Sequence, residues 1–210
     1  MPTTVILLAI IALAILLILL LLLRPHLAEQ RSGKVLAFLA FLALPGLAAT
    51  LGASSHLETS KTTEFCLSCH EMQPYGESLL IDDAEYLPAS HYQNKRLPRE
   101  KACFSCHTDY TMYGDFAAKL RGVKHLRVHY LDTIPEEIAL YNPYQNRECL
   151  HCHGGARSFE ENEFHVDLMA ELKTGETSCL DCHSSVHDVH EVADQPKWSP
   201  SGAGGEGGDR

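Results

Sequence analysis

Four copies of one cysteine motif constrain this chain more than any other feature of its sequence. A histidine directly follows each of four CxxC pairs, so the motif CxxCH occurs four times. Zinc sites and disulfide frameworks use paired cysteines, but neither requires a histidine after every pair. The motif predicts covalent attachment of four c-type haems. The attachment residues are Cys66, Cys69, Cys103, Cys106, Cys149, Cys152, Cys179 and Cys182.

Four irons have eight axial positions, and histidines could fill most of them. The motif histidines are the first candidates, namely His70, His107, His153 and His183. Outside the motifs, the candidates are His91, His125, His129, His165, His187 and His190. Met72 lies two residues after His70 and could bind the first iron in its place. Two histidines on one haem iron give a low-potential site, whereas a thioether ligand raises the potential.

Two apolar segments precede the motifs. Residues 5–23 are an unbroken apolar run, long enough to cross a bilayer as a helix. A cleaved signal peptide would instead show a basic start and a shorter apolar core. Residues 35–52 are interrupted by Pro45 and Gly46 but can still span, because a membrane helix tolerates such a break. We therefore expect a membrane anchor of two helices at residues 1–52.

The loop between these segments sets the expected orientation. It carries Arg24, Arg31 and Lys34 against a single acid, Glu29. The positive-inside rule then places the loop in the cytoplasm and both outer ends of the hairpin on the other side. Since haem c is attached outside the cytoplasm, we expect a bacterial inner-membrane protein with its haem domain in the periplasm.

The remaining chain is expected to form a compact multihaem domain at residues 53–190 and a flexible tail at 191–210, which is rich in Gly, Ser and Pro. Periodicity predicts one helix at residues 113–131 and another at 160–173 that ends near Gly175. No stretch alternates like a strand. We expect a mainly α fold with extensive irregular structure, in which the haems supply much of the apolar core.

The net charge of the chain limits which kinds of partner molecule it can bind. The first 52 residues hold 3 basic and 1 acidic residue of the chain's 17 and 27, so the part from Ala53 onward carries 14 basic and 26 acidic residues. This excess of negative charge argues against nucleic acid binding. It favours a redox partner that presents a positive face.

Several motifs resemble the NapC/NirT family of membrane-anchored tetrahaem cytochromes, which includes the small quinol-oxidising subunits of nitrite reductase complexes. The resemblance runs from the second apolar segment to about His190. It rests on "FCLSCHEM" at the first motif, "SHYQN" around His91, "KTGETSCLDCH" through the fourth motif, and His187 shortly after it.

The resemblance implies roles for individual residues. The first haem would lie at the membrane surface on the quinol side, with Met72 as its ligand in place of His70. His91 would be the distal ligand of the fourth haem, and His187 that of the second. Lys119, twelve residues after His107, would lie in the quinol pocket.

The chain also departs from the family pattern. Residues 5–23 form an extra apolar helix, and His190 is a rival to His187. His165 is a further distal candidate, in competition with His129. An acid expected near His125 is missing, so either Asp115 or His125 would accept protons beside Lys119.

The resulting functional expectation is oxidation of menaquinol or a related quinol. Electrons would pass along four covalent haem c groups to a periplasmic or extracellular reductase or cytochrome, with a hetero-oligomer as one arrangement. Two alternatives stay open. The protein could relay electrons without its own quinol site, or it could itself reduce a small nitrite-like ligand at an open iron.

Overall fold

The structure is a computed structural model that describes residues 2–199, apart from 136–137, 139, 141 and 191. The chain divides into two units, Met1–Ser60 and Lys61–Arg210. The described residues are mainly helical, and among them the sole β-type pairing is an isolated antiparallel bridge between Ile81 and Lys197. The predicted fold class, mainly α with irregular connections, is confirmed.

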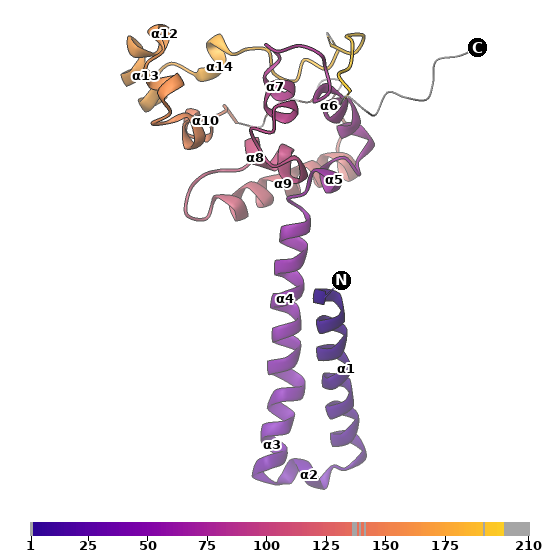
Figure 1. The fold of residues 1–210 in the computed structure, drawn as a ribbon. Helices are drawn as coiled ribbons and strands as arrows, with labels where there is room; N and C mark the ends of the chain where they lie inside the picture. The colour runs from indigo at the N-terminus through magenta and orange to yellow at the C-terminus, as the bar shows by residue number, and fades with distance from the viewer. Residues whose placement is uncertain (1, 136–137, 139, 141, 191, 200–210) are drawn as a thin grey trace, which may run out of the picture. The chain divides into compact units, whose positions relative to one another are not determined.

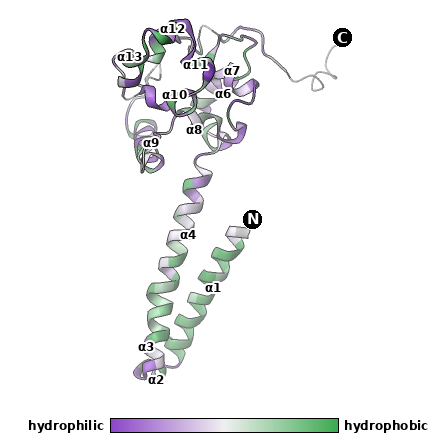
Figure 2. Ribbon diagram, turned by 60° about the vertical axis from the view of Figure 1, so that its left-hand side comes forward, coloured by the Kyte–Doolittle hydropathy of each residue, from purple (hydrophilic) through white to green (hydrophobic). Residues whose placement is uncertain are grey.

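The first unit is a helical hairpin in which α1 packs against α4 (Figure 1). Its elements are α1 (Pro2–Leu23), α2 (His26–Glu29), α3 (Arg31–Phe38), the π-helical segment η1 (Leu39–Ala43) and α4 (Leu44–Thr59). Two spans, Thr3–Leu23 and Arg31–Thr59, are long and apolar enough to cross a membrane. Figure 2 shows hydrophobic residues along α1 and along the part of the second span near α3, whereas the far end of α4 is more hydrophilic. The boundary that we expected after residue 52 falls within α4, which continues to Thr59.

Proline and glycine shape the second span locally. Pro45 has no N–H to donate, and its ring crowds the carbonyl four residues earlier. The wider π-helical turn of η1 ends two residues before Pro45, where such a change of hydrogen-bonding register absorbs the mismatch. Gly33 lies at the turn of the hairpin, where an added Cβ atom would be 1.6 Å from the carbonyl oxygen of Leu27. Only glycine fits there.

The second unit consists of short helices joined by irregular segments, with one longer helix. In chain order they are α5 (Thr63–Cys66), η2 (His70–Met72), α6 (Gln73–Ser78), α7 (Leu87–Gln93), η3 (Arg99–Lys101), α8 (Ala102–Cys106), α9 (Gly114–Leu131), α10 (Asn146–His153), α11 (Arg157–Glu160), α12 (Glu163–Val166), α13 (Met169–Thr174) and α14 (Cys179–Cys182). Helix α9 confirms the helix predicted at residues 113–131.

The second predicted helix, at residues 160–173, is wrong. The chain forms three short helices there, α11, α12 and α13. Asn162 accounts for the break, because its side-chain oxygen accepts a hydrogen bond from the backbone N–H of Phe164 and starts a new helix. The expected end near Gly175 is correct, since Gly175 adopts a left-handed conformation with φ of 79° after α13.

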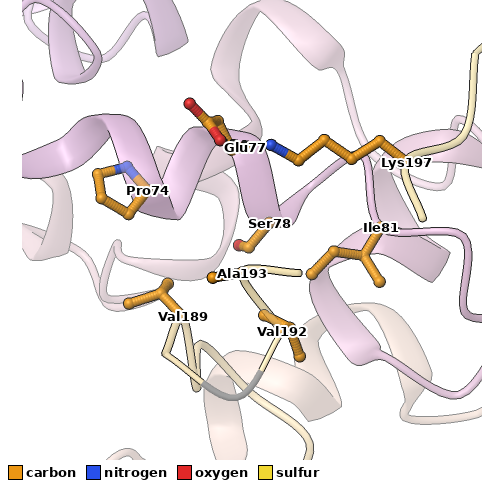
Figure 3. A pocket seen from close by; sticks show the side chains of 8 residues that line it. All are labelled: Pro74, Glu77, Ser78, Ile81, Val189, Val192, Ala193 and Lys197. Carbon is orange, nitrogen blue, oxygen red and sulfur yellow. Dashed lines mark hydrogen bonds and ion pairs between the residues drawn. The ribbon is translucent and has the colours of Figure 1, made fainter. Parts of the chain in front are cut away.

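A small apolar cluster brings the end of the described chain onto the loop after α6. Ile81, Tyr86, Ala89 and Val192 form it. The backbone N–H of Trp198 also donates to the carbonyl of Leu80 at 2.6 Å. Figure 3 shows Lys197 directed at Glu77, with which it forms an ion pair, beside a cavity of about 60 Å³. These contacts hold the described part of the segment that we expected to be a flexible tail; residues 191 and 200–210 lie outside the description.

Candidate functional site

Each predicted haem-attachment motif begins on its own short helix: α5, α8, α10 and α14. In every motif the first cysteine is half-buried and the second is exposed. Two of these helices have side-chain caps. Thr62 accepts a hydrogen bond from the N–H of Phe65, and Ser178 forms a reciprocal capping box with Asp181. The caps fix the residue at which each of these helices begins. They therefore also fix the direction in which the cysteine side chains point.

Side-chain hydrogen bonds connect the first motif with the second. The hydroxyl of Thr63, in α5, donates to the carbonyl of Arg99 at 2.8 Å. The same oxygen accepts from the N–H of Ala102 at 2.8 Å. One threonine therefore joins the helix of the first motif to the start of α8.

A second set of bonds connects the second motif with the third. Glu148, a buried residue of α10, accepts from the backbone N–H of Tyr110 at 2.9 Å. The hydroxyl of Tyr144 donates to the carbonyl of Cys106 at 2.6 Å. The ring of Tyr110 also stacks on that of His151, with centroids 3.8 Å apart.

Asn146 connects the third motif with the fourth. Its side-chain amide is buried and donates to the carbonyls of Leu172 at 2.9 Å and Thr177 at 2.7 Å. Its side-chain oxygen accepts from the N–H of Cys179 at 2.9 Å. The single side chain thus fixes α14 relative to α10.

The cysteines of neighbouring motifs meet as a result. Hydrogen bonding to Cys103 lowers the pKa of the Cys66 thiol to about 7, and Cys149 does the same for Cys179. Desolvation of the Cys106 sulfur by the groups around it, with a smaller contribution from Cys152, raises the pKa of the Cys106 thiol. The attachment sites therefore follow one another in space in their order along the chain.

Every motif histidine faces a histidine from outside the motifs. The ring centroids are 6.1 Å apart for His70 and His129, 5.9 Å for His107 and His187, 5.9 Å for His153 and His91, and 6.2 Å for His183 and His165. With metal–nitrogen bonds of about 2.0 Å, two imidazoles on opposite sides of one iron place their centroids roughly 6 Å apart. All four pairs have the spacing of bis-histidine ligation, so the residues fit haem.

Hydrogen bonds orient two of the distal rings for this role. Nδ1 of His91 lies 2.9 Å from the carbonyl oxygen of Leu87, and Nδ1 of His165 lies 3.2 Å from that of Phe159. A bond of this kind fixes the tautomer and leaves Nε2 to bind a metal.

His187 is held differently. Its φ is 56°, in the left-handed region that non-glycine residues rarely adopt. Its Nδ1 is buried without a hydrogen-bond partner. Burial and the nearby His107 lower the pKa of His187 to about 4, which keeps the imidazole neutral as a metal ligand must be.

The first pair is the more open one and includes a carboxylate. The His70 side chain is 79% exposed, and that of His129 is 38% exposed. Glu71 lies 2.7 Å from Nδ1 of His129 and 3.3 Å from Nε2 of His70. A metal at Nε2 of His70 would displace Glu71 from that nitrogen and leave its contact with His129. Met72, the ligand favoured by the sequence, ends η2, the same short helix that His70 begins.

The pairs also show where the expected distal ligands lie. The ring of His187 lies 5.9 Å from that of His107 in the second motif, and His190 is exposed. His91 was expected at the fourth motif, but its ring faces His153 of the third. His165 takes the place opposite the fourth motif. The sequence does not reveal this arrangement, because it depends on the positions of α7 and α12 relative to the motifs in the fold.

A charged cluster lies beside the first two attachment sites. Lys61 is buried and forms an ion pair of 2.7 Å with Asp115 at the start of α9. The hydroxyl of Thr108 donates to the other oxygen of Asp115 at 2.9 Å. The bond from Lys61 is the main reason why the pKa of Asp115 is lowered. Asp115 is therefore held as a carboxylate.

Lys119 lies one turn further along α9. Its ammonium is 4.5 Å from the centre of the Phe104 ring, and Lys61 lies 5.6 Å from the same ring. Burial is the main reason why the pKa of Lys119 is lowered, and Cys66 and Asp115 oppose that shift. The predicted residues Lys119 and Asp115 thus lie together, with Cys66 close by.

His125, the third predicted residue of this group, interacts instead with His107. No pattern in the sequence singles out Lys61, Glu71 or Asn146. A lysine that follows an apolar segment is usually expected to face solvent or lipid headgroups. The residues next to Lys61 in the sequence do not indicate that its side chain is buried. Asn146 precedes a cysteine motif by three residues, but its three bonds are visible only in the fold.

Comparison with known proteins gives a consistent set of similarities. The NapC/NirT cytochrome c family, N-terminal region, matches residues 28–195. The cytochrome c-type protein NapC of Haemophilus influenzae is 24% identical over 168 residues, which is 72% of this chain and 78% of that protein. The cytochrome c-type protein TorC of Escherichia coli K12 is 27% identical over 179 residues, 76% of this chain and 43% of TorC. No solved structure matches.

Proposed function

Because the chain belongs to the NapC/NirT family of c-type cytochromes, we propose that it oxidises a quinol, menaquinol or a close relative, and passes the electrons to a redox partner outside the cytoplasm. It is a multihaem c-type cytochrome, and such proteins transfer electrons in respiration. The observation that carries the quinol assignment is the cluster of Lys61, Asp115 and Lys119 next to Cys66 and Cys103.

The membrane anchor supports a location where quinol is available. Its two apolar spans are joined by a segment with three basic residues and one acid. The positive-inside rule supports a cytoplasmic loop, an inner-membrane anchor and a second unit on the periplasmic side.

The four histidine pairs support four haems. When bound, each haem supplies a one-electron acceptor. Our assignment gives His70 and His129 to the first haem, His107 and His187 to the second, His153 and His91 to the third, and His183 and His165 to the fourth. It replaces the preference for Met72, moves His91 from the fourth haem to the third and gives His165 to the fourth, because each motif ring already has a second imidazole about 6 Å away.

The cluster of Lys61, Asp115 and Lys119 would accept the protons that quinol oxidation releases. Oxidation of a quinol to a quinone releases two electrons and two protons. Lys119 donates a hydrogen bond to one quinol oxygen, which its position over Phe104 and beside Cys66 allows. Asp115, kept ionised by Lys61 and Thr108, is the nearby carboxylate that takes the two protons one after the other and returns each to water. Its side chain is 55% exposed, so that exit is open.

The histidine pairs argue against the reductase alternative. A small nitrite-like substrate needs an iron with an open position, whereas every motif histidine has a facing imidazole within 6.2 Å. The protein would then transfer its electrons to a separate redox partner. NapC and TorC are both named as c-type cytochromes, and a periplasmic or extracellular reductase or cytochrome in a hetero-oligomer would suit this chain.

Lys119→Ala tests the quinol site. We expect it to slow menaquinol-driven reduction of the haems in membranes about 100-fold, the scale of one positioned catalytic group. Lys124→Ala, on the same helix, is the control and should leave the rate unchanged. Dithionite should fully reduce the haems of both variants. If Lys119→Ala leaves the rate unchanged, the quinol site is elsewhere or the protein is a relay without one.

A further inference from the structure

The four histidines that face the motif histidines differ in what surrounds one atom, Nδ1. In His91 and His165 this atom lies 2.9 Å and 3.2 Å from a backbone carbonyl oxygen. In His187 it is buried without a hydrogen-bond partner. In His129 it lies 2.7 Å from Oε1 of Glu71, which is a carboxylate oxygen. Of these four histidines, His129 is therefore the one with a charged partner.

The contact between Glu71 and His129 joins two segments that are far apart in the sequence. Glu71 lies in η2, and His129 lies in the last turn of α9. The Glu71 side chain is 16% exposed. Within the described part of the chain, its ion pairs are with His70 and His129, and no lysine or arginine neutralises it. The negative charge of Glu71 therefore acts on the His129 ring.

A carboxylate at Nδ1 changes how strongly an imidazole donates electrons to a metal. The hydrogen bond from Nδ1–H fixes the tautomer, leaves Nε2 for the metal and raises the basicity of the ring. A bond to an ionised acceptor is roughly twice as strong as one to a neutral acceptor. A more basic ligand stabilises ferric over ferrous iron and so lowers the reduction potential. A backbone carbonyl acts in the same direction but more weakly, and an Nδ1 without a partner has no such effect.

We propose that Glu71 is a positioning residue that, through its hydrogen bond to His129, sets the reduction potential of the first haem below that of the second. The proposal rests on the assignment of His129 and His187 to these two haems under the proposed function. It does not depend on quinol oxidation.

The contrast between His129 and His187 gives electron transfer a direction. The Nδ1 atom of His129 has a carboxylate partner, whereas that of His187 has none. This difference favours ferric iron at the first haem and ferrous iron at the second. A two-electron donor that reacts at the first haem must deliver its electrons one at a time. Glu71 would therefore help the first electron to leave before the second arrives.

Redox titration of the full-length, haem-loaded protein, followed by electron paramagnetic resonance, tests this proposal. Glu71→Gln keeps the size of the side chain and an oxygen that can accept the bond, but removes the charge. We expect the reduced-to-oxidised ratio of one haem at a fixed potential to rise about tenfold, which is about 59 mV for a one-electron couple. Glu77→Gln is the control, since Glu77 pairs with Lys197 instead of a histidine, and it should change that ratio less than about twofold.

Two ligand variants identify which haem has shifted. His129→Ala should turn the haem that Glu71→Gln shifts, and no other, from low-spin to high-spin. In the unsubstituted protein, that haem should titrate at a lower potential than the haem that His187→Ala makes high-spin. This comparison also holds if Glu71→Gln takes up haem poorly. Unchanged potentials in Glu71→Gln, a shift at a different haem, or the reverse order of the two potentials would overturn the proposal. None of these measurements uses quinol, so a failure of the quinol assignment would show separately.

Discussion

At the scale of single residues, histidine geometry decides how this chain would hold its irons. The candidate attachment cysteines and the motif histidines are visible in the sequence, because CxxCH is a local pattern. The distal ligands could not be assigned in the same way, since nothing local in "SHYQN" or around His165 states which motif it will face. Only the fold places His91 opposite His153 and His165 opposite His183.

The assignment of His91 leads to a specific result. In His91→Ala, one low-spin haem should become high-spin in the electron paramagnetic resonance spectrum. In His91→Ala with His153→Ala, the same site loses both ligands, so no second low-spin signal should change. If His91 instead bound the fourth haem, His91→Ala with His153→Ala would change the spectra of two haems. The control variant, His91→Ala with His183→Ala, would then change the spectrum of one haem.

The ion pair of Lys61 and Asp115 predicts a pH dependence. Because the pKa of Asp115 is lowered in the folded protein, the pair stabilises the fold above the ordinary pKa of an aspartate and loses this effect as pH falls through the lowered value. Asp115→Asn should therefore reduce the free energy of unfolding at neutral pH by about 0.5–1 kcal/mol, a value small because Asp115 is partly exposed.

Denaturant titrations that monitor haem absorbance would measure this difference. At a pH below the lowered pKa, Asp115→Asn and the parent protein should unfold at the same denaturant concentration. Asp132→Asn, at a more weakly paired aspartate after α9, is the matched control. A destabilisation by Asp115→Asn that persists unchanged in acid would contradict the electrostatic explanation.

At the scale of helices, the predictable parts are those with a strong local pattern. The apolar spans and α9 follow from hydropathy and periodicity, and the structure contains them. The helix predicted at residues 160–173 is wrong because the periodicity there is weak. The side-chain cap of Asn162 starts a new short helix within that range. The connections between motifs depend on single polar side chains, and no period in the sequence reveals these.

Asn146 should be the most sensitive of these connecting residues. Asn146→Ala would leave two buried carbonyls and the N–H of Cys179 without their bonds. At about 1–3 kcal/mol for a buried unsatisfied group, we expect a loss of about 3 kcal/mol or more in the free energy of unfolding. Thermal unfolding followed by haem absorbance would measure it.

Asn162→Ala provides the comparison for that experiment. It removes an exposed helix cap and should cost about 1 kcal/mol. Equal losses for Asn146→Ala and Asn162→Ala would show that the third and fourth motifs are held together by something other than Asn146.

At the scale of the whole molecule, an acidic multihaem domain is tied to an apolar anchor. The negative balance beyond Ala53 predicts that electron transfer to a basic partner depends on salt. The rate of electron transfer to a basic soluble cytochrome c should fall as ionic strength rises from about 0.01 M to 0.15 M. At the higher value, salt largely screens exposed charges that are more than about 8 Å apart. Reduction of a small neutral oxidant is the control and should not change. A rate independent of salt would argue for an uncharged docking surface.

The central claim is that this chain takes electrons from quinol by itself. The most direct measurement mixes the purified full-length protein, oxidised and in nanodiscs, with a reduced menaquinone analogue in a stopped-flow spectrometer. Our account predicts reduction of the haems without any other protein, and a much slower reaction for Lys119→Ala. If the haems of the intact protein stay oxidised with quinol while dithionite reduces them, the protein has no quinol site and the account is contradicted.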